Sequence, residues 1–258
     1  EIWLGLVGSE MCIRDRTLVF LWLVVCFTPF FFFSLFKILV PWRPFQHVVT
    51  DILLGLTYCW TWGVNTGVRW AMKMEYDFQG FENLDKRGRY FIFANHIAWW
   101  DIVMLFDIYH GTIPFPRWFL KRQLIWVPMI GYVCWAVDMP FMHRITPEQI
   151  EKNPKLKGKD LEVTRRSCSK FIDRPVTIAN YLEGTRFTME KHRQSGSQYR
   201  NLLPPKMGGT GFVLNAMGEM LDGIIDMTLV YSPGAEPKFS NFIAGKVRKV
   251  VVRARMLD

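Results

Sequence analysis

The sequence contains little of what builds metal centres and disulfide frameworks. It has five histidines and five cysteines in 258 residues, and no two cysteines have the C-x-x-C spacing of zinc sites and redox pairs. The cysteines are odd in number and lie far apart, at Cys12, Cys26, Cys59, Cys134 and Cys168. This pattern indicates a reduced compartment in which thiols serve as small apolar side chains. We therefore expect neither a metal nor a bound cofactor.

The sequence also lacks the motifs of several common function classes. No G-x-S-x-G segment is present, which excludes the strand-to-helix elbow that carries the serine nucleophile of α/β-hydrolases. Zinc-finger spacing, the aromatic signature of RNA-binding domains and a basic DNA-reading helix are missing as well. A nucleic-acid partner is therefore not expected, although the chain is basic, with a net charge of +9 and a pI near 9.4.

What the chain has in quantity is apolar surface: half of its residues are hydrophobic and 16% are aromatic. Together with the positive charge, this composition indicates contact with an anionic membrane surface. Thr17–Phe36 contains no charged residue and has the length of a membrane helix, which needs ~20 apolar residues. Two basic residues precede this segment (Arg14 and Arg16) and two follow it (Lys37 and Arg43), so the positive-inside rule does not orient it.

A second uncharged segment, Ile52–Val68, is less apolar because it contains threonine, asparagine and three glycines. Its aromatic residues Tyr58, Trp60 and Trp62 suit the headgroup zone of a bilayer. We predict an interfacial or re-entrant helix that forms an antiparallel hairpin with the first segment. A second full membrane span is the alternative, and the sequence does not decide between a helix that lies on the membrane and one that spans it.

From residue 74 onward, predicted strands alternate with predicted helices. Short apolar runs bounded by glycine or polar residues indicate strands, at Met74–Phe81, Tyr90–Ala94, Trp118–Lys121, Val137–Met142, Val176–Leu182, Ile224–Tyr231 and Lys246–Arg255. Helices are expected in Leu124–Trp135, starting near Pro128, in Pro147–Asp173 and in the run that ends near Met217. This alternation predicts an α/β fold, with a mixed, largely parallel sheet flanked by helices and preceded by the membrane-anchoring hairpin.

A histidine and an aspartate stand where a predicted strand gives way to a helix. Asn95-His96 follows the apolar strand Tyr90–Ala94, and Asp101 begins the next apolar run. Residues five apart lie ~140° apart on a regular helix, so His96 and Asp101 meet only if His96 precedes the helix. The carboxylate would then orient the imidazole, whose ordinary pKa near ~6.5 suits a general base. Taken alone, the motif leaves open a histidine that ends a strand and an aspartate that caps a helix.

Three further motifs follow the His96–Asp101 pair in order. They are Phe119-Leu120-Lys121 with Pro128-x-x-Gly131, then Glu183-Gly184-Thr185-Arg186, then Leu203-Pro204-Pro205-Lys206. Together the four motifs resemble the PlsC-type glycerolipid acyltransferases, the 1-acylglycerol-3-phosphate acyltransferases. The resemblance runs from about Trp42 to Tyr231. Two stretches, Leu120–Arg144 and Glu183–Lys191, resemble most closely a bacterial inner-membrane branch of that family.

The resemblance implies transfer of a fatty acyl group from acyl-CoA or acyl-carrier protein to the free hydroxyl of a lysophospholipid. The expected acceptor is 1-acylglycerol-3-phosphate, which gives phosphatidic acid. Another lysolipid acceptor and a catalytically idle lipid-binding scaffold are the alternatives. In the family pattern His96 is the base and Asp101 orients it. Substrate binding would fall to Glu183, Gly184, Thr185 and Arg186, with the Arg186 guanidinium on the acceptor phosphate.

Two further cations, Lys121 and Arg144, are candidates for a second positive charge at the phosphate site. The alternative for each is a cation at a sheet edge. The sequence departs from the family pattern at two positions. Gln123 stands where many members have glutamate, and Leu182 stands where an aromatic residue or a proline usually precedes Glu-Gly-Thr-Arg. The change at Gln123 bears on an acidic contact and on the identity of the acceptor.

We predict that the chain has three parts. Residues 1–16 are expected to be a non-native or disordered tail, residues 17–70 a membrane anchor, and residues 71–258 the acyltransferase domain, truncated at its C-terminus. Because acyl-CoA and acyl-carrier protein are cytosolic, we expect the domain on the cytoplasmic side of a bacterial inner membrane. The expected partners are these two donors, the lysophospholipid and membrane lipids.

Overall fold

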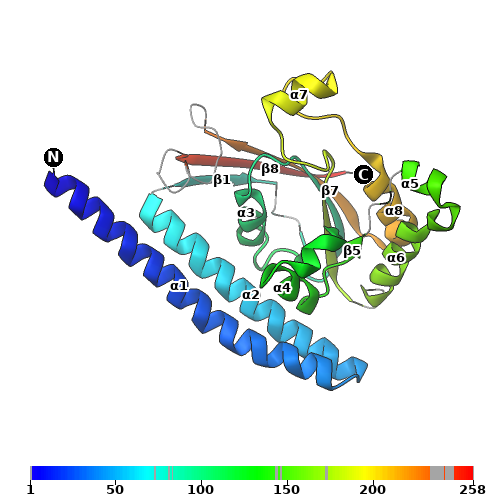
Figure 1. Cartoon of the computed structure of the whole chain (residues 1–258), viewed down its shortest axis with the longest axis horizontal. Coiled ribbons are helices and arrows are strands. Elements are labelled where there is room, and N and C mark those ends of the chain that lie inside the picture. Colours follow the sequence, from blue (N-terminus) through cyan, green and yellow to red (C-terminus); the bar gives the residue numbers. More distant parts are fainter. Residues whose placement is uncertain are drawn as a thin grey trace. The chain divides into compact units, whose positions relative to one another are not determined.

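The chain folds into two compact units, Glu1–Ala71 and Met72–Asp258 (Figure 1). The computed structural model describes residues 2–72, 74–80, 82, 84–142, 145, 147–171, 174–232, 241 and 247–257. The first unit contains two long helices, and the second contains a six-stranded sheet with shorter helices. Each unit is described separately below.

The first unit is a pair of helices, α1 (Ile2–Leu39) and α2 (Arg43–Met72), joined by a short turn. The indole Nε1 of Trp22 in α1 donates a hydrogen bond to the carbonyl of Trp60 in α2, at 3.2 Å. Gly63 makes this approach possible, because a Cβ at that position would lie 2.2 Å from the Trp22 Nε1. The predicted antiparallel hairpin is therefore confirmed as a pair of packed helices.

Within α1, Phe20–Leu39 is long and apolar enough to cross a membrane, with a mean hydropathy of 2.0 over 20 residues. It overlaps most of the predicted segment Thr17–Phe36. The second predicted segment, Ile52–Val68, belongs to one continuous helix, α2, and no other helix among the described residues meets the same criterion. Helix α1 begins at Ile2, so it includes residues 2–16 of the predicted tail.

The second unit is built on a sheet with the strand order β1-β8-β7-β2-β6-β3. Its strands are β1 (Glu75–Gln79), β2 (Arg89–Ala94), β3 (Pro116–Trp118), β6 (Val176–Tyr181), β7 (Gly223–Tyr231) and β8 (Lys249–Leu257). Every neighbouring pair is parallel except β7 and β8, which are antiparallel. The predicted α/β fold with a mixed, largely parallel sheet is confirmed.

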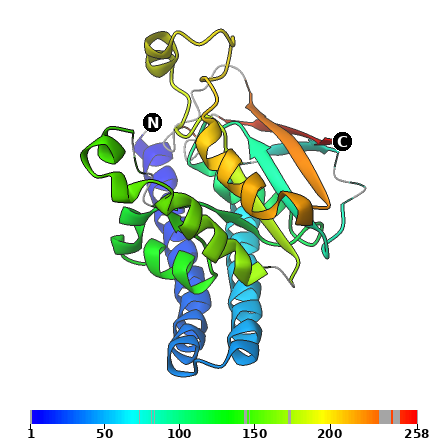
Figure 2. The ribbon, with the colours of Figure 1, turned by 90° about the vertical axis from the view of Figure 1, so that its right-hand side faces the viewer.

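Helices flank this sheet. They are α3 (Trp100–Ile108), α4 (Ile130–Ala136), α5 (Pro147–Lys152), α6 (Lys159–Cys168), α7 (Met189–Ser195) and α8 (Met207–Met217). Among the described residues, short 3₁₀-helices occur as well, namely η1 (Arg122–Trp126), η2 (Pro154–Leu156), η3 (Ser169–Phe171) and η4 (Gly218–Met220). Figure 2 shows α6 and α8 side by side over one face of the sheet.

Two strand predictions between residues 118 and 142 were wrong in detail. The predicted strand Trp118–Lys121 is divided between β3 and β4 (Leu120–Lys121), and β4 pairs with β5 (Phe141–Met142) in a separate two-stranded sheet. Helix α4 (Ile130–Ala136) begins close to Pro128, as predicted, and Met129, with a φ of 63°, separates it from η1. The predicted strand Val137–Met142 shrinks to β5, because Asp138 also has a positive φ.

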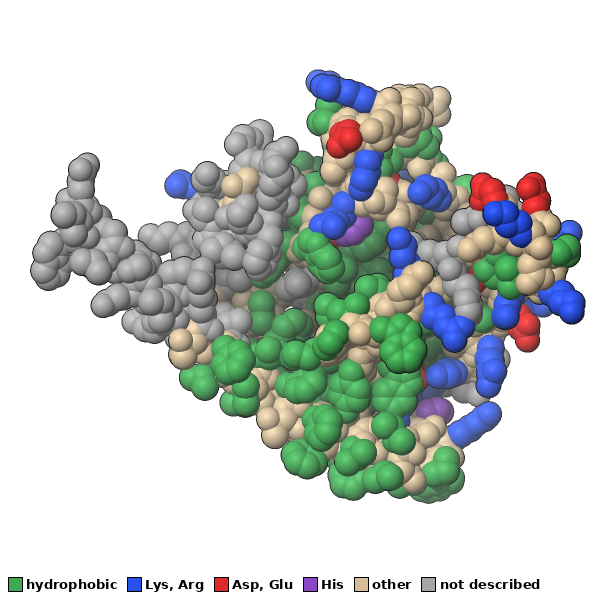
Figure 3. All heavy atoms as spheres, in the orientation of Figure 1, with side chains coloured by type: hydrophobic (Ala, Val, Ile, Leu, Met, Phe, Trp, Pro, Cys, Tyr) green, Lys and Arg blue, Asp and Glu red, His purple; other side chains and the backbone are tan. Residues whose placement is uncertain are grey.

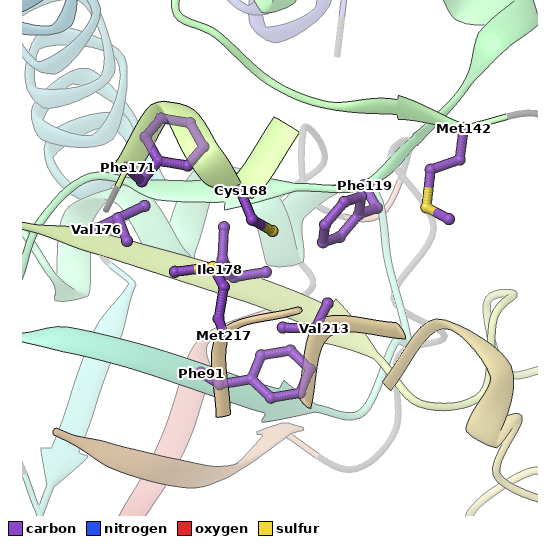
Figure 4. Packing of buried hydrophobic residues seen from close by; sticks show 9 residues of the cluster. All are labelled: Phe91, Phe119, Met142, Cys168, Phe171, Val176, Ile178, Val213 and Met217. Atoms are coloured by element: carbon purple, nitrogen blue, oxygen red, sulfur yellow. The ribbon is translucent and has the colours of Figure 1, made fainter. Parts of the chain in front are cut away.

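The core on the α6–α8 face joins side chains from distant parts of the sequence. Its buried residues are Phe91, Phe119, Met142, Cys168, Phe171, Val176, Ile178, Val213 and Met217 (Figure 4). On the other face, β7 turns Ile225, Met227, Leu229 and Tyr231 inward, and the hydroxyl of Tyr109, directly after α3, donates to the Met227 sulfur at 3.1 Å. Alternation along β2 and β7 thus assigns one row of side chains to each helical layer.

Candidate active site

The predicted histidine and aspartate meet at the carboxyl end of β2. His96 lies in the turn between β2 and α3, and Asp101 lies in the first turn of α3. The His96 Nδ1 is 2.8 Å from the Asp101 Oδ2. An ionised carboxylate only accepts hydrogen bonds, so Nδ1 carries the proton and Nε2 keeps its lone pair. The His96 side chain is 16% exposed, which leaves the ring open to a substrate.

The Asp101 carboxylate is buried, with no exposed area, and it accepts four hydrogen bonds. Its Oδ2 accepts from His96 and from the backbone N–H groups of Ile97 and Ala98, at 2.7 and 2.9 Å. Its Oδ1 accepts from the hydroxyl of Tyr231, at the end of β7. A buried charge is stable only when its hydrogen-bonding capacity is met in this way. Its place at the N-terminus of α3 adds a favourable dipole.

Asn95 ends β2 in a way that projects His96 out of the sheet. Its side-chain amide donates to the carbonyl of Leu229 at 2.9 Å, and its side-chain oxygen accepts from the N–H of Leu229 at 2.8 Å. The side chain therefore replaces the backbone in the ladder to β7, one step beyond the pair formed by Ala94 and Met227. The main chain is free to turn at the next residue, His96. Asn95 is thus a structural member of the motif.

The register of β2 and β6 brings the Glu183 motif beside His96. Ala94 pairs with Tyr181, so residues two positions further along both strands are also neighbours. The Glu183 carboxylate is almost fully buried and accepts from the N–H of His96 and the N–H of Leu203, each at 3.0 Å. The carbonyl of His96 accepts from the N–H of Phe187 at 2.7 Å. Glu183 therefore fixes the backbone of the histidine rather than a neighbouring cation.

The ring of Tyr181 lies against one face of the His96 imidazole. The two rings are stacked, with centroids 4.0 Å apart and an interplanar angle of 12°. Burial raises the pKa of the Tyr181 hydroxyl well above its ordinary value, and the nearby Asp101 carboxylate raises it further. Tyr181 is therefore neutral at working pH. Stacking and the bond to Asp101 together restrict the imidazole to one orientation.

Arginine and lysine side chains lie at the turn that follows β6. Arg186 is exposed and places its guanidinium carbon 5.0 Å from the centre of the Trp99 ring, a cation–π contact. The Lys191 Nζ donates to the Thr185 hydroxyl at 2.8 Å and to the Arg186 carbonyl at 3.1 Å. Figure 3 shows Lys and Arg side chains spread over this face of the second unit, with few carboxylates among them.

Gly184 leaves room for another lysine. It has a φ of 66°, a left-handed conformation that favours glycine. A Cβ at this position would lie 3.0 Å from the Lys206 Cδ. The N–H of Lys206 donates to the carbonyl of Leu182 at 2.7 Å, so the lysine is tied to the chain that precedes Gly184. The glycine therefore lets the Lys206 stem lie against the turn that carries Arg186.

Six of the eight predicted site residues come together, and these are His96, Asp101, Glu183, Gly184, Thr185 and Arg186. Lys121 is an exposed residue of β4 and forms no hydrogen bond or ion pair with any described member of this group. Arg144 lies outside the described residues. The structure shows no ion pair between Glu183 and Arg186, both of which it describes: Glu183 is buried and accepts from backbone N–H groups, whereas Arg186 is exposed.

Sequence reasoning missed three residues at this site: Tyr231, Tyr181 and Lys206. For Tyr231, the alternation of apolar and polar residues gave a usable signal, since it forms one apolar row of a predicted strand with Ile225, Met227 and Leu229. Tyr181 directly precedes the Leu182-Glu183 pair, and Lys206 closes a recognised motif. No local pattern showed that the Tyr231 hydroxyl and Asp101, 130 positions apart, share a hydrogen bond.

The thiols and the metal-binding capacity of the described residues do not suggest another chemistry. Burial raises the pKa of Cys134 to about 11 and that of Cys168 to about 12, so neither is a thiolate nucleophile at neutral pH. Across the described ranges, no group of three or more His, Cys, Asp or Glu side chains is placed to hold a metal ion.

Comparison with known proteins agrees with this geometry. Residues 75–232, more than half of the chain, match the acyltransferase family. The chain belongs to the acyltransferase family. In general terms, this family implies an acyl donor and a lipid acceptor.

Two known proteins are similar to this chain. It is similar to 1-acyl-sn-glycerol-3-phosphate acyltransferase 3 of Arabidopsis thaliana, with 24% identity over 148 residues. That match covers 53% of this chain and 36% of the relative, little more than a third of its length. The crystal structure of the 1-acyl-sn-glycerophosphate (LPA) acyltransferase PlsC from Thermotoga maritima matches with a TM-score of 0.53 and 14% identity. The match covers 95% of this acyltransferase and 87% of PlsC, and it shows a common fold.

Replacing Glu183 by glutamine tests its role as a backbone anchor. Glutamine presents an NH₂ group to one of two N–H donors, so one buried donor loses its acceptor. We expect the free energy of unfolding to fall by ~1–3 kcal/mol, measured by urea denaturation of the detergent-solubilised protein. The control is Glu190→Gln on the exposed surface of α7, which should change stability by less than ~0.5 kcal/mol. Equal effects of the two substitutions would contradict the anchoring role.

Proposed function

We propose that this acyltransferase moves a fatty acyl group from acyl-CoA or acyl-carrier protein to the free hydroxyl of a lysophospholipid. The proposed acceptor is 1-acylglycerol-3-phosphate, and the product is then phosphatidic acid. The observation that carries the proposal is the His96–Asp101 pair: Nδ1 is held by a buried carboxylate, and Nε2 keeps its lone pair on a ring that is not fully buried. The exposed cation Arg186 lies on the turn next to this base.

In the proposed reaction, the acceptor oxygen attacks the carbonyl carbon of the thioester while its proton passes to the His96 Nε2. Asp101 stabilises the imidazolium that forms. As the tetrahedral intermediate collapses, the C–S bond breaks and the imidazolium returns its proton to the leaving sulfur. The products are the ester and a free thiol. A direct transfer is favoured because no serine or cysteine nucleophile stands in the motif, and burial keeps the thiols of Cys134 and Cys168 protonated at neutral pH.

The acceptor phosphate is proposed to bind at the turn after β6. Arg186 offers a planar fork of N–H donors, and Lys206 lies against Gly184 on the same turn. Thr185 is held by Lys191, and Glu183 supports the backbone from the buried side. Lys121 and Arg144 remain proposed as further positive charges for the same phosphate.

We propose that the protein acts at a bacterial inner membrane, with α1 as the anchor and the second unit on the cytoplasmic side. The length and hydropathy of Phe20–Leu39 support the anchor, and the cytosolic location of the donors supports the orientation. The finer resemblance to a bacterial inner-membrane branch stays a prediction, since the two relatives named above come from a plant and from Thermotoga maritima. Another lysolipid acceptor is the second candidate, and labelled acyl-CoA offered with a panel of lysophospholipids separates the two.

His96→Ala tests the proposed base. Turnover of labelled acyl-CoA with 1-acylglycerol-3-phosphate should fall by ~10²–10⁴-fold, the usual contribution of a positioned base. The melting temperature should change little, because the Asp101 carboxylate keeps three other donors. The control is His110→Ala at an exposed position of the same unit, which should retain most activity. A His96→Ala variant with more than a tenth of the parental rate would refute the assignment.

Arg186 should recognise the acceptor phosphate rather than the donor. Loss of a charge-assisted contact costs ~1.5–3 kcal/mol, so Arg186→Ala should lower kcat/KM for the lysophospholipid by ~10- to 100-fold. Arg186→Lys keeps the charge but loses the fork, and its defect should be smaller. The KM for acyl-CoA should stay close to that of the parent in both variants.

The matched control for Arg186 is Arg193→Ala, which removes an exposed arginine of α7. It should leave both kinetic parameters nearly unchanged. If Arg186→Ala instead weakens acyl-CoA and spares the lysophospholipid, Arg186 serves the phosphates of the donor, and the acceptor site is elsewhere.

A further inference from the structure

In the segment formed by η1 and α4, the pattern of buried and exposed side chains is the opposite of that usual in a folded domain. It exposes large apolar side chains, and Trp126 is 83% exposed. Its other exposed apolar residues are Ile125, Val127, Met129, Ile130 and Trp135. The buried residues of α4 are Gly131 and Ala136, and η1 has none. A helix that covers a core buries its large side chains and exposes small or polar ones, so this surface points to an external apolar partner.

This Ile125–Ile130 surface has a defined backbone conformation. The N–H of Gly131 donates to the carbonyl of Val127 at 2.9 Å, and the N–H of Ile130 donates to that of Pro128 at 2.7 Å. Gly131 packs directly on the preceding turn, because a Cβ there would lie 2.2 Å from the carbonyl oxygen of Ile125. The apolar side chains are therefore held outward by an ordered turn.

The charge next to the Ile125–Ile130 surface is positive. Lys121 and Arg122 precede it and are exposed. The sequence contains no aspartate or glutamate between Ile108 and Val137. Figure 3 shows hydrophobic side chains gathered over the position of α4. An exposed tryptophan with aliphatic neighbours and adjacent cations is the composition that binds the headgroup region of an anionic bilayer.

We propose that the Ile125–Ile130 surface inserts into the headgroup region of an anionic lipid bilayer. The acyltransferase unit then has a membrane contact of its own, in addition to any that α1 provides. The insertion would bring the second unit to the surface where a lysophospholipid acceptor resides. This last consequence rests on the proposed function, but the insertion itself is measurable without catalysis.

The test uses the full chain in vesicles of phosphatidylcholine and phosphatidylglycerol with brominated acyl chains. Subtracting the fluorescence emission of the Trp126→Phe variant from that of the parent protein gives the emission of Trp126. The brominated chains should strongly quench this emission. The same difference for Trp118→Phe reports a buried tryptophan and should show weak quenching. An unquenched Trp126 overturns the proposal, whether the surface is then covered by another segment of this chain or by a second copy.

The anionic preference is tested with the same signal. Arg122→Gln should reduce the quenching of Trp126 on vesicles that contain phosphatidylglycerol, whereas Arg193→Gln, at an exposed position of α7, should not. Equal quenching on neutral and anionic vesicles would overturn the role of charge. If Trp126 of the parent protein is quenched but the parent transfers no acyl group to a lysophospholipid, the proposed function is wrong and the membrane contact still holds.

A second inference comes from the partner of the Asp101 Oδ1. Tyr231 is buried at the end of β7, and its hydroxyl donates to this oxygen. The other three donors all bind Oδ2. We infer that Tyr231 is a positioning residue, which fixes the plane of the Asp101 carboxylate and reduces the negative charge that His96 experiences.

The hydrogen bond from Tyr231 weakens the effect of the Asp101 charge on His96. A donor on Oδ1 stabilises the carboxylate charge, so the carboxylate stabilises the imidazolium less strongly. Burial, followed by the Asp101 charge, raises the pKa of Tyr231 well above its ordinary value, so the hydroxyl remains a donor throughout the working range. The other ionisable groups around the pair are Tyr181 below the ring, Tyr76 near Tyr231, and Glu183 and Arg186 on the turn after β6.

The variant Tyr231→Phe removes the donor and keeps the ring. The titration midpoint of the His96 ring, followed by NMR of histidine-labelled protein and assigned with His96→Gln, should rise by a few tenths of a pH unit or more. The control is Tyr90→Phe, which removes another buried hydroxyl that accepts from the N–H of Asp85 at 2.9 Å, at the far end of β2. An unchanged midpoint in Tyr231→Phe, or an equal rise in both variants, overturns the inference. The readout is independent of acyl transfer.

Discussion

The buried carboxylate of Asp101 is the group on which the candidate active site depends. Removing a carboxylate from water costs several kcal/mol even after relaxation, and here four hydrogen bonds offset that cost. Three of them arise in the turn between β2 and α3, but the fourth comes from Tyr231 at the end of β7. The carboxylate is therefore stable only when β7 lies beside β2. The interaction that orients His96 also joins the turn to the sheet.

The parallel sheet explains why residues far apart in the sequence converge here. The carboxyl ends of parallel strands meet at one edge, where the loops after them can form a site. Because Ala94 pairs with Tyr181, the turn after β2 and the turn after β6 run side by side. Glu183 then binds the N–H of His96, and Phe187 binds its carbonyl. A shift of one residue in this register would separate the glutamate from the histidine and turn Tyr181 to the other face.

The candidate active site has a buried side and a solvent-exposed side, and the two sides suit different tasks. Asp101, Glu183 and Tyr231 are buried and hydrogen-bonded, Asp101 to Tyr231 and Glu183 to backbone N–H groups, so they hold a fixed arrangement of charge around the imidazole. Arg186 is exposed, and it is held by the Trp99 ring rather than by a carboxylate. An exposed cation is screened by salt and binds an anion weakly by charge alone. Its selectivity must therefore come from geometry, which the forked guanidinium and the tight turn at Gly184 provide.

The sequence by itself determined the α/β class, the pair of N-terminal helices and the place of His96 and Asp101 at a strand-to-helix turn. These features follow from local causes: hydrophobic periodicity, a long uncharged segment, and the spacing of two residues within one turn. The tertiary structure alone decided that Tyr231 bonds Asp101, that Glu183 supports the backbone of His96, and that the strand predicted at Trp118–Lys121 is divided between two sheets. These outcomes depend on strand order and register, which are set by packing between segments far apart in the sequence. No local pattern records which distant N–H or O–H group will reach a buried carboxylate.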